Sequence, residues 1–266
     1  MESREPRSRS LAPKEHGAYG QLGIPLLTAL SMGSPTPVAG LLLAASVAAF
    51  LLHEPVLVLL GRRGGRAARE HGPRARRWLV VSALVSALCA SAALGLASTE
   101  TRVAVLCSVF LAVVSAVVVW RDVERTLAGE LIAGATLSST GLAVATGSHV
   151  PLADALAAWA VFAFGLSVAT LGVRAVVAHA KTGARLLARG WPMLVPSGLA
   201  GMVLVARVGP AWARLAAGPL FLVAWALILA PPKAKALPRL GWALVAATVV
   251  TMGIVVVGFR LTASIP

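Results

Sequence analysis

Long apolar runs, separated by short polar or basic segments, make up almost the whole chain after residue 17. A helix of about 20 apolar residues is long enough to cross the hydrocarbon core of a bilayer. The runs predict nine membrane-spanning helices, at residues 18–32, 38–60, 78–97, 103–120, 126–147, 152–178, 191–206, 212–229 and 240–259. The first and the seventh are short for a crossing and contain prolines, so the predicted count depends most on these two.

The composition agrees with this pattern. The chain of 266 residues is 58% hydrophobic and only 13% charged, whereas about 25% of the residues in soluble domains are charged. A soluble domain with so little charge could not cover its own surface. We therefore predict an all-α, polytopic transmembrane bundle with a disordered basic tail at residues 1–17, a transmembrane domain at 18–261 and a short tail at 262–266.

The basic residues predict the orientation of the helices. Of the 24 Lys and Arg residues, all but Arg102, Arg207, Arg214 and Arg260 would lie on one side of the nine predicted helices. Cytoplasmic loops carry the excess of Lys and Arg in membrane proteins, so we expect a cytoplasmic N-terminus and a C-terminus outside. Because the basic residues form short clusters and no stripe on a soluble domain, nucleic acid is not an expected partner.

The expected partners are the lipid bilayer and its anionic phospholipids. The candidate contacts to anionic lipid or to phosphate are Arg62, Arg63, Arg66, Arg174, Lys181 and Arg185. Cys89 and Cys107 both lie inside apolar runs, where a single cysteine is usually a packing residue. No Cys/His spacing resembles a metal site, so the sequence predicts neither a metal nor another cofactor.

Two glutamates, Glu54 and Glu130, lie inside apolar runs, a few residues from the predicted cytoplasmic ends of their helices. At about 1.5 Å per residue, both would lie on the order of 10 Å below the membrane surface. A carboxylate at that depth costs roughly a few kcal/mol unless it is paired, protonated or hydrated. Either the two glutamates face one cavity that is open to the cytoplasm, or they are structural groups that hold helices together.

Further polar residues would enter the membrane from the same side. The candidate polar site comprises Lys14, Glu15, His16, Tyr19, Gln21, His53, Glu54, Arg121, Asp122, Arg125 and Glu130. Some of these have plainer interpretations: Lys14 and Tyr19 as anchors in the headgroup layer, and His53 as a partner for backbone groups that Pro55 frees. The two arginines could reach lipid phosphates, and Arg121 could pair locally with Asp122.

Three short motifs resemble a known family. Residues 13–22, with Ile24 and Pro25 directly behind them, are similar to the N-terminal signature of the YwiC-like family of bacterial integral membrane proteins. The motif His53-Glu54-Pro55 and residues 125–130 are similar to that family too. The resemblance implies a multi-pass protein of the bacterial inner membrane, and it implies no particular reaction.

We expect the cytoplasm-facing polar site to bind an anionic or lipid-borne small molecule, with an isoprenoid among the candidates. A first alternative is a membrane enzyme whose architecture resembles the UbiA prenyltransferases, although the loops after the second and sixth predicted helices lack the Asp-rich motifs that hold magnesium there. A second is a transporter that uses Glu54 and Glu130 for a proton or a cation. A third is a non-catalytic subunit, and the oligomeric state stays open.

Overall fold

The structure is a computed structural model that describes residues 16–182, 209–229 and 237–263. The regular elements in these ranges are all helices, with no strand among them. They are α1 (His16–Met32), α2 (Pro37–Leu51), α3 (His53–Leu59), α4 (Gly65–Leu96), α5 (Thr99–Trp120), α6 (Leu127–Gly147), α7 (Leu152–Thr182), α9 (Ala211–Leu229) and α10 (Leu237–Ala263).

The helices follow the predicted spans closely. Every predicted span coincides with a helix except the seventh, residues 191–206, which lies outside the described residues. Within the described ranges, 7 helices are long and apolar enough to cross a membrane, with α2 and α3 counted together. Helix α1, with 17 residues, is not among these seven. The chain is therefore a helical protein with several membrane-spanning segments, while nine remains a predicted count.

One helix boundary differs strongly from the prediction. Helix α4 begins at Gly65, well before the predicted span at residues 78–97, while the ends of α1, α5, α7 and α10 extend the predicted spans by two to four residues. The segment expected as a basic loop is thus mostly helical and continues directly into the apolar part of α4. Its Arg, Ala and Glu residues are strong helix formers, which explains the early start.

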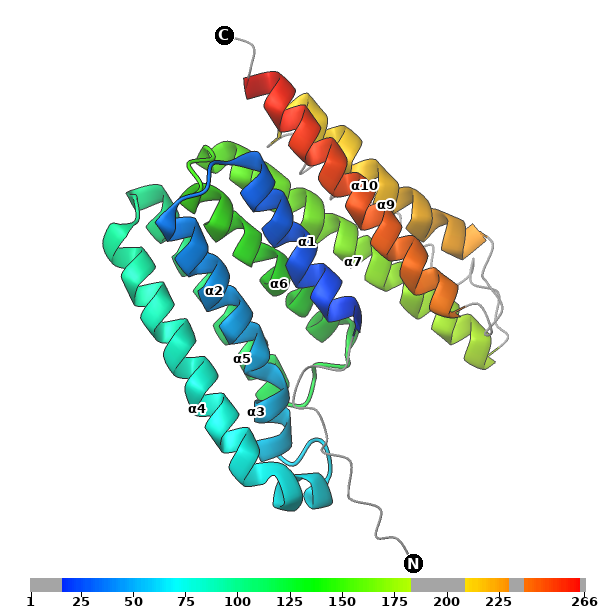
Figure 1. The fold of residues 1–266 in the computed structure, drawn as a ribbon. Helices are drawn as coiled ribbons and strands as arrows, with labels where there is room; N and C mark the ends of the chain where they lie inside the picture. Colours follow the sequence, from blue (N-terminus) through cyan, green and yellow to red (C-terminus); the bar gives the residue numbers. More distant parts are fainter. Residues whose placement is uncertain (1–15, 183–208, 230–236, 264–266) are drawn as a thin grey trace, which may run out of the picture.

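The helices pack around α6, which contacts α1, α2, α5 and α7. Helix α4 lies against α2 and α3 on one flank of the molecule, and α9 and α10 lie against α7 and α1 on the other (Figure 1). The α3–α4 and α5–α6 connections lie at the same end of the molecule, at the bottom of Figure 1. Because most of the described arginines lie in or beside these two connections, we call this the basic end.

Pro55 explains why α2 and α3 are two helices. Proline has no N–H to donate to the carbonyl four residues earlier, and its ring clashes with that carbonyl. The regular α-helix stops at Leu51, and the N–H of Leu52 bonds instead to the carbonyl of Ala49, three residues back. The chain then starts again as α3 with Glu54 in its first turn. The break thus sets the direction of Glu54.

The end opposite the basic end is tightly packed. The hydroxyl of Thr36 caps α2 and also donates to the carbonyl of Gly147, 2.6 Å away. The N–H of Ser34 donates to the carbonyl of Ser148 at 3.0 Å. The largest cluster of buried apolar side chains lies behind these bonds, with members from α1, α2, α6, α7 and α9. Hydrogen bonds and core packing therefore join the α1–α2 connection to the α6–α7 connection.

Helices α4 and α5 present apolar faces to the surroundings. Leu84 and Leu88 of α4 and Leu106 and Phe110 of α5 are all more than half exposed. In water such a surface would be unfavourable, because each square ångström of exposed apolar area costs about 25 cal/mol. In a bilayer these side chains lie against lipid tails, as expected for spanning helices.

Candidate functional site

A cavity of about 880 Å³ lies among α1, α2, α3, α5, α6, α7 and α10. Most of its lining is apolar, and it reaches from the basic end to the middle of the bundle. Its charged and ionisable lining residues are His53, Glu54, Arg63, Glu124, Arg125 and Glu130. All six come from α3, α6 or the connections at the basic end, so charge is concentrated at one mouth of an otherwise apolar chamber.

Glu54 is the most deeply buried ionisable group at this mouth, with a side chain only 3% exposed. Arg63, in the α3–α4 connection, binds it in a bidentate pair. Nε donates to Oε1 at 3.0 Å and a terminal nitrogen donates to Oε2 at 2.6 Å. A planar guanidinium matches both carboxylate oxygens, so one partner compensates the buried charge.

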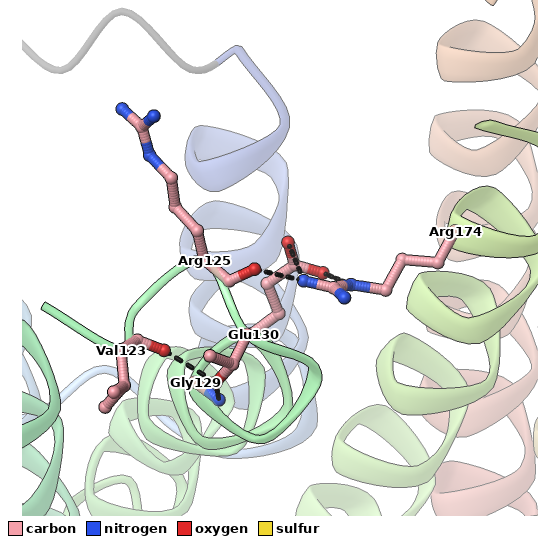
Figure 2. Close-up of polar contacts among 6 residues, drawn as sticks. Val123, Arg125, Gly129, Glu130 and Arg174 are labelled. Carbon is pink, nitrogen blue, oxygen red and sulfur yellow. Dashed lines mark hydrogen bonds and ion pairs between the residues drawn. The ribbon is translucent and has the colours of Figure 1, made fainter. Parts of the chain in front are cut away.

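Glu130, in the first turn of α6, forms a second bidentate pair with Arg174 of α7 (Figure 2). Nε of Arg174 donates to Oε2 at 2.6 Å, and Nη2 donates to Oε1 at 2.9 Å. The same Nη2 also donates to the backbone carbonyl of Arg125. These side chains are over a third exposed, unlike Glu54. One arginine thus ties α7 both to α6 and to the connection that precedes α6.

We call residues 121–126, which join α5 to α6, the mouth loop. Its backbone folds back onto α6 at Gly129, where a Cβ atom would lie 2.4 Å from the carbonyl oxygen of Val123. The hydroxyl of Thr126 accepts from the N–H of Gly129 and donates to the carbonyl of Val123. Only glycine leaves room for this approach, so Gly129 allows the mouth loop to rest on α6, and the hydrogen bonds of Thr126 hold it there.

Arg62 holds the other end of the mouth loop. It donates to the carbonyl of Trp120 at 3.1 Å and forms an ion pair with Asp122. Asp122 has a φ of 61°, a conformation that aspartate adopts more readily than most residues. The mouth loop is therefore held by arginines from two sides, Arg62 at its start and Arg174 at its end.

Glu124 and Arg125 of the mouth loop have no ion pair among the described residues. Oε2 of Glu124 is buried and has no hydrogen-bond partner among the described residues. A buried acceptor without a donor costs about 1–3 kcal/mol, and more when it is charged. The guanidinium of Arg125 points away from the Glu130–Arg174 pair in Figure 2, and the described part of the chain shows no ion pair for it.

The comparisons with known proteins add one finding to this geometry. The family model described as YwiC-like protein matches residues 12–145, which is just over half of the chain. The chain belongs to the YwiC-like family. Neither the curated proteins nor the solved structures contain a match to it.

The part that matches the YwiC-like model contains most of the charged mouth. It includes α1 to α5, the mouth loop and nearly all of α6, and thus the Glu54–Arg63 pair, Glu124, Arg125 and Glu130. Arg174 lies beyond the match, on α7. The ion pair between Glu130 and Arg174 therefore joins the matched part of this YwiC-like protein to the remainder of the chain.

The structure places five of the predicted polar-site residues in the cavity lining: Gln21, His53, Glu54, Arg125 and Glu130. Arg121 and Asp122 lie in the exposed mouth loop and do not line it. Tyr19 packs edge-to-face on Phe50, with ring centroids 5.1 Å apart.

Five of the predicted residues have side chains that the structure does not describe. Lys14, Glu15 and Arg185 lie outside the described residues, and only the backbone is described for His16 and Lys181.

Several of the arginines that were expected to contact lipid or phosphate have carboxylate partners. Arg63 binds Glu54 and Arg174 binds Glu130. Arg62 binds Asp122, for which the sequence offered Arg121 as one possible partner. Arg66 pairs with Glu70, one turn along α4 and ahead of its apolar part. The hydrogen bond from Arg66 lowers the pKa of the Glu70 carboxyl, so this pair stays ionised at neutral pH.

Sequence reasoning missed Glu124, which lies in a polar segment where charged residues are ordinary. The available signal was its position between two candidate residues, Asp122 and Arg125. Within the described residues, no cluster of three or more His, Cys, Asp or Glu side chains could hold a metal ion.

Proposed function

We propose that this YwiC-like protein binds a lipid-borne amphiphile in the cavity, with the apolar tail among α1, α5, α6 and α10 and the charged headgroup at the basic end. The observation that supports this most is the separation of charge from apolar surface within one chamber of about 880 Å³. Small-molecule sites commonly have volumes of about 300–1,000 Å³, so the chamber suits a ligand with a substantial tail.

The headgroup in this proposal carries an anionic group. Arg125 lines the mouth and has no ion-pair partner among the described residues, so its guanidinium is available to a phosphate or a carboxylate. Arg63 and Arg174 lie at the same mouth but are engaged by glutamates. Arg125 is therefore the first contact of the anionic group, with Arg174 close to its backbone.

The orientation that we propose has the basic end in the cytoplasm of a bacterial cell, with nine spans in the inner membrane, an inside N-terminus and an outside C-terminus. Its support is the accumulation of arginines at one end of the described helices, as the positive-inside rule requires. The cavity then opens toward the cytoplasmic leaflet. The residues that line it include none from the α1–α2, α4–α5 or α6–α7 connections at the other end.

The UbiA-like architecture and the transporter remain predictions from the sequence. In the transporter, Glu54 and Glu130 would release their arginines when they take up a proton or a cation. An amphiphile-binding site does not require the glutamates to release their arginines. The pathways of small ions are commonly lined by polar or charged groups, whereas most of this cavity lining is apolar.

A cavity-filling substitution tests the proposal. Ala133 lines the chamber from α6, whereas Ala83 lies on the exposed face of α4 and does not. In protein extracted gently from its own membrane, native mass spectrometry should find a bound amphiphile in the wild type and in Ala83→Trp, and little of it in Ala133→Trp. Equal retention in all three proteins would contradict the proposal.

A further inference from the structure

Glu124 and Arg125 are neighbours in the chain, and both line the charged mouth of the cavity. Of the three carboxylates in the lining, Glu54 and Glu130 have arginine partners at hydrogen-bonding distance. Glu124 has a buried oxygen, Oε2, with no donor among the described residues. The two complete ion pairs leave one carboxylate and one guanidinium at the mouth for a ligand.

From this we propose that the headgroup bound here is zwitterionic, with a primary ammonium that donates to Glu124 and a phosphate that accepts from Arg125. This inference rests on the proposed function and specifies the ligand class of the same site. An ammonium carries three donors and a positive charge, which a buried carboxylate oxygen needs. A phosphate accepts well from a guanidinium. A purely anionic headgroup would satisfy Arg125 and leave Oε2 of Glu124 without a donor.

The mouth loop is held in a way that suits a rigid headgroup site. Its backbone is fixed at both ends by Arg62 and Arg174, and it rests on Gly129 with no room for a Cβ atom. Figure 2 shows the Arg125 side chain directed away from the Glu130–Arg174 pair. The carboxylate of Glu124 and the guanidinium of Arg125 therefore lie on a loop that the protein itself holds in place. Binding a headgroup there needs little additional ordering of the backbone, so its entropic cost is small.

Competition between three phospholipids with identical oleoyl chains tests this inference. The full-length protein is given equal amounts of dioleoyl phosphatidylethanolamine, phosphatidylcholine and phosphatidylglycerol, and native mass spectrometry measures how much of each stays bound. Phosphatidylcholine has the same net charge as phosphatidylethanolamine but no N–H donor, and phosphatidylglycerol is anionic. We expect the wild type to favour phosphatidylethanolamine over each of the others by about tenfold, the ratio for one charge-assisted hydrogen bond.

The variants assign this preference to the two residues. Glu124→Gln should bring the ratio of phosphatidylethanolamine to phosphatidylcholine close to one, while Glu100→Gln, at the far end of the bundle in the first turn of α5, should leave it unchanged. Arg125→Gln should lower retention of all three lipids, because each has a phosphate. The ratio is measured within one sample, so a loss of folded protein does not alter it.

The proposal of a zwitterionic headgroup would be wrong if the wild type bound the three lipids equally or bound phosphatidylglycerol most strongly. It would also be wrong if Glu124→Gln left the ratio of phosphatidylethanolamine to phosphatidylcholine unchanged. If Ala133→Trp still removes the bound lipid, these results reject only the headgroup class. If Ala133→Trp retains lipid as the wild type does, the cavity is not the binding site, and both proposals fail.

Discussion

Glu54 and Arg63 form the least exposed of the ion pairs seen in the described residues, with side chains 3% and 22% exposed. Breaking a buried pair by removing one partner leaves a charge without compensation, and the cost depends on which charge stays. The short glutamate side chain stays buried in α3, whereas the longer arginine side chain, already 22% exposed, can move toward the membrane surface. Removing the arginine should therefore be the more damaging change.

We expect Arg63→Gln to lower the free energy of unfolding by about 3–5 kcal/mol and Glu54→Gln to lower it by clearly less. The double variant should recover part of the loss, because no unpaired charge is then buried. Thermal unfolding of the purified variants in detergent measures the order of their stabilities. Arg66→Gln is the control, since its pair with Glu70 lies on the surface. A larger loss for Glu54→Gln would show that the arginine is the group that depends on its partner.

Two glycines on α6 give a matched comparison for the mouth loop. A Cβ at Gly129 would clash with backbone atoms of Val123 and Glu124, whereas one at Gly134 would make an ordinary contact of 3.8 Å with Leu166. Gly129→Ala should cost about 1–3 kcal/mol of stability, as overpacking does, and should reduce amphiphile retention because the loop shifts. Gly134→Ala should change neither, and a similar effect of both substitutions on melting temperature or retention would count against this account of the loop.

At the scale of elements, the break between α2 and α3 positions the only glutamate in α3. Without Pro55, the carbonyl of Leu51 could accept the missing N–H bond and α2 could continue as one helix through Leu59. A continuous helix would turn Glu54 away from its present direction and pull it from Arg63. The break is thus part of the site, although Pro55 itself has no polar group in the cavity.

Pro55→Ala should retain the fold and its helix content but lose bound amphiphile, because Glu54 and His53 no longer face the mouth in the same way. Circular dichroism and native mass spectrometry on the same sample measure the two effects. Pro73→Ala, in the exposed basic part of α4, is the matched control and should retain the ligand. Full retention in Pro55→Ala would mean that the break does not orient the site.

The sequence predicts the elements better than their contacts. Apolar runs identify the helices because each span must be apolar over its own length, which is a local property. The Glu130–Arg174 pair depends on how α6 packs against α7. The two residues are 44 positions apart in the chain, and no local sequence pattern specifies which residues of the two helices meet. For the same reason, the sequence does not predict the carboxylate partners of Arg63 and Arg174 or the buried oxygen of Glu124.

At the scale of the whole molecule, one end of the bundle is packed and the other contains a charged cavity. At the packed end, hydrogen bonds join the α1–α2 connection to the end of α6 and the α6–α7 connection. The charged residues at the other end are those that the positive-inside rule assigns to the cytoplasm. The proposed ligand would thus enter from the cytoplasmic leaflet with its headgroup level with the mouth loop.

This orientation predicts the reactivity of single cysteines toward a membrane-impermeant maleimide. After Cys89 and Cys107 are changed to serine, Glu70→Cys at the basic end should react only in opened cells. Thr99→Cys and Thr262→Cys should react in intact spheroplasts. Both positions are exposed at the end opposite the basic end, Thr99 at the start of α5 and Thr262 near the end of α10. Reaction at position 70 in intact spheroplasts would reverse the orientation, and a protected position 262 would change the number of spans.

The most direct test of the central claim is a cryo-EM map of the full-length protein in nanodiscs made from its own membrane lipids, with a bound antibody fragment to add mass. We predict one elongated density inside the cavity, with its broad end beside Glu124 and Arg125 and its tail between α5, α6 and α10. A chamber filled only by protein side chains, or lipid density confined to the outer faces of α4 and α5, would contradict it.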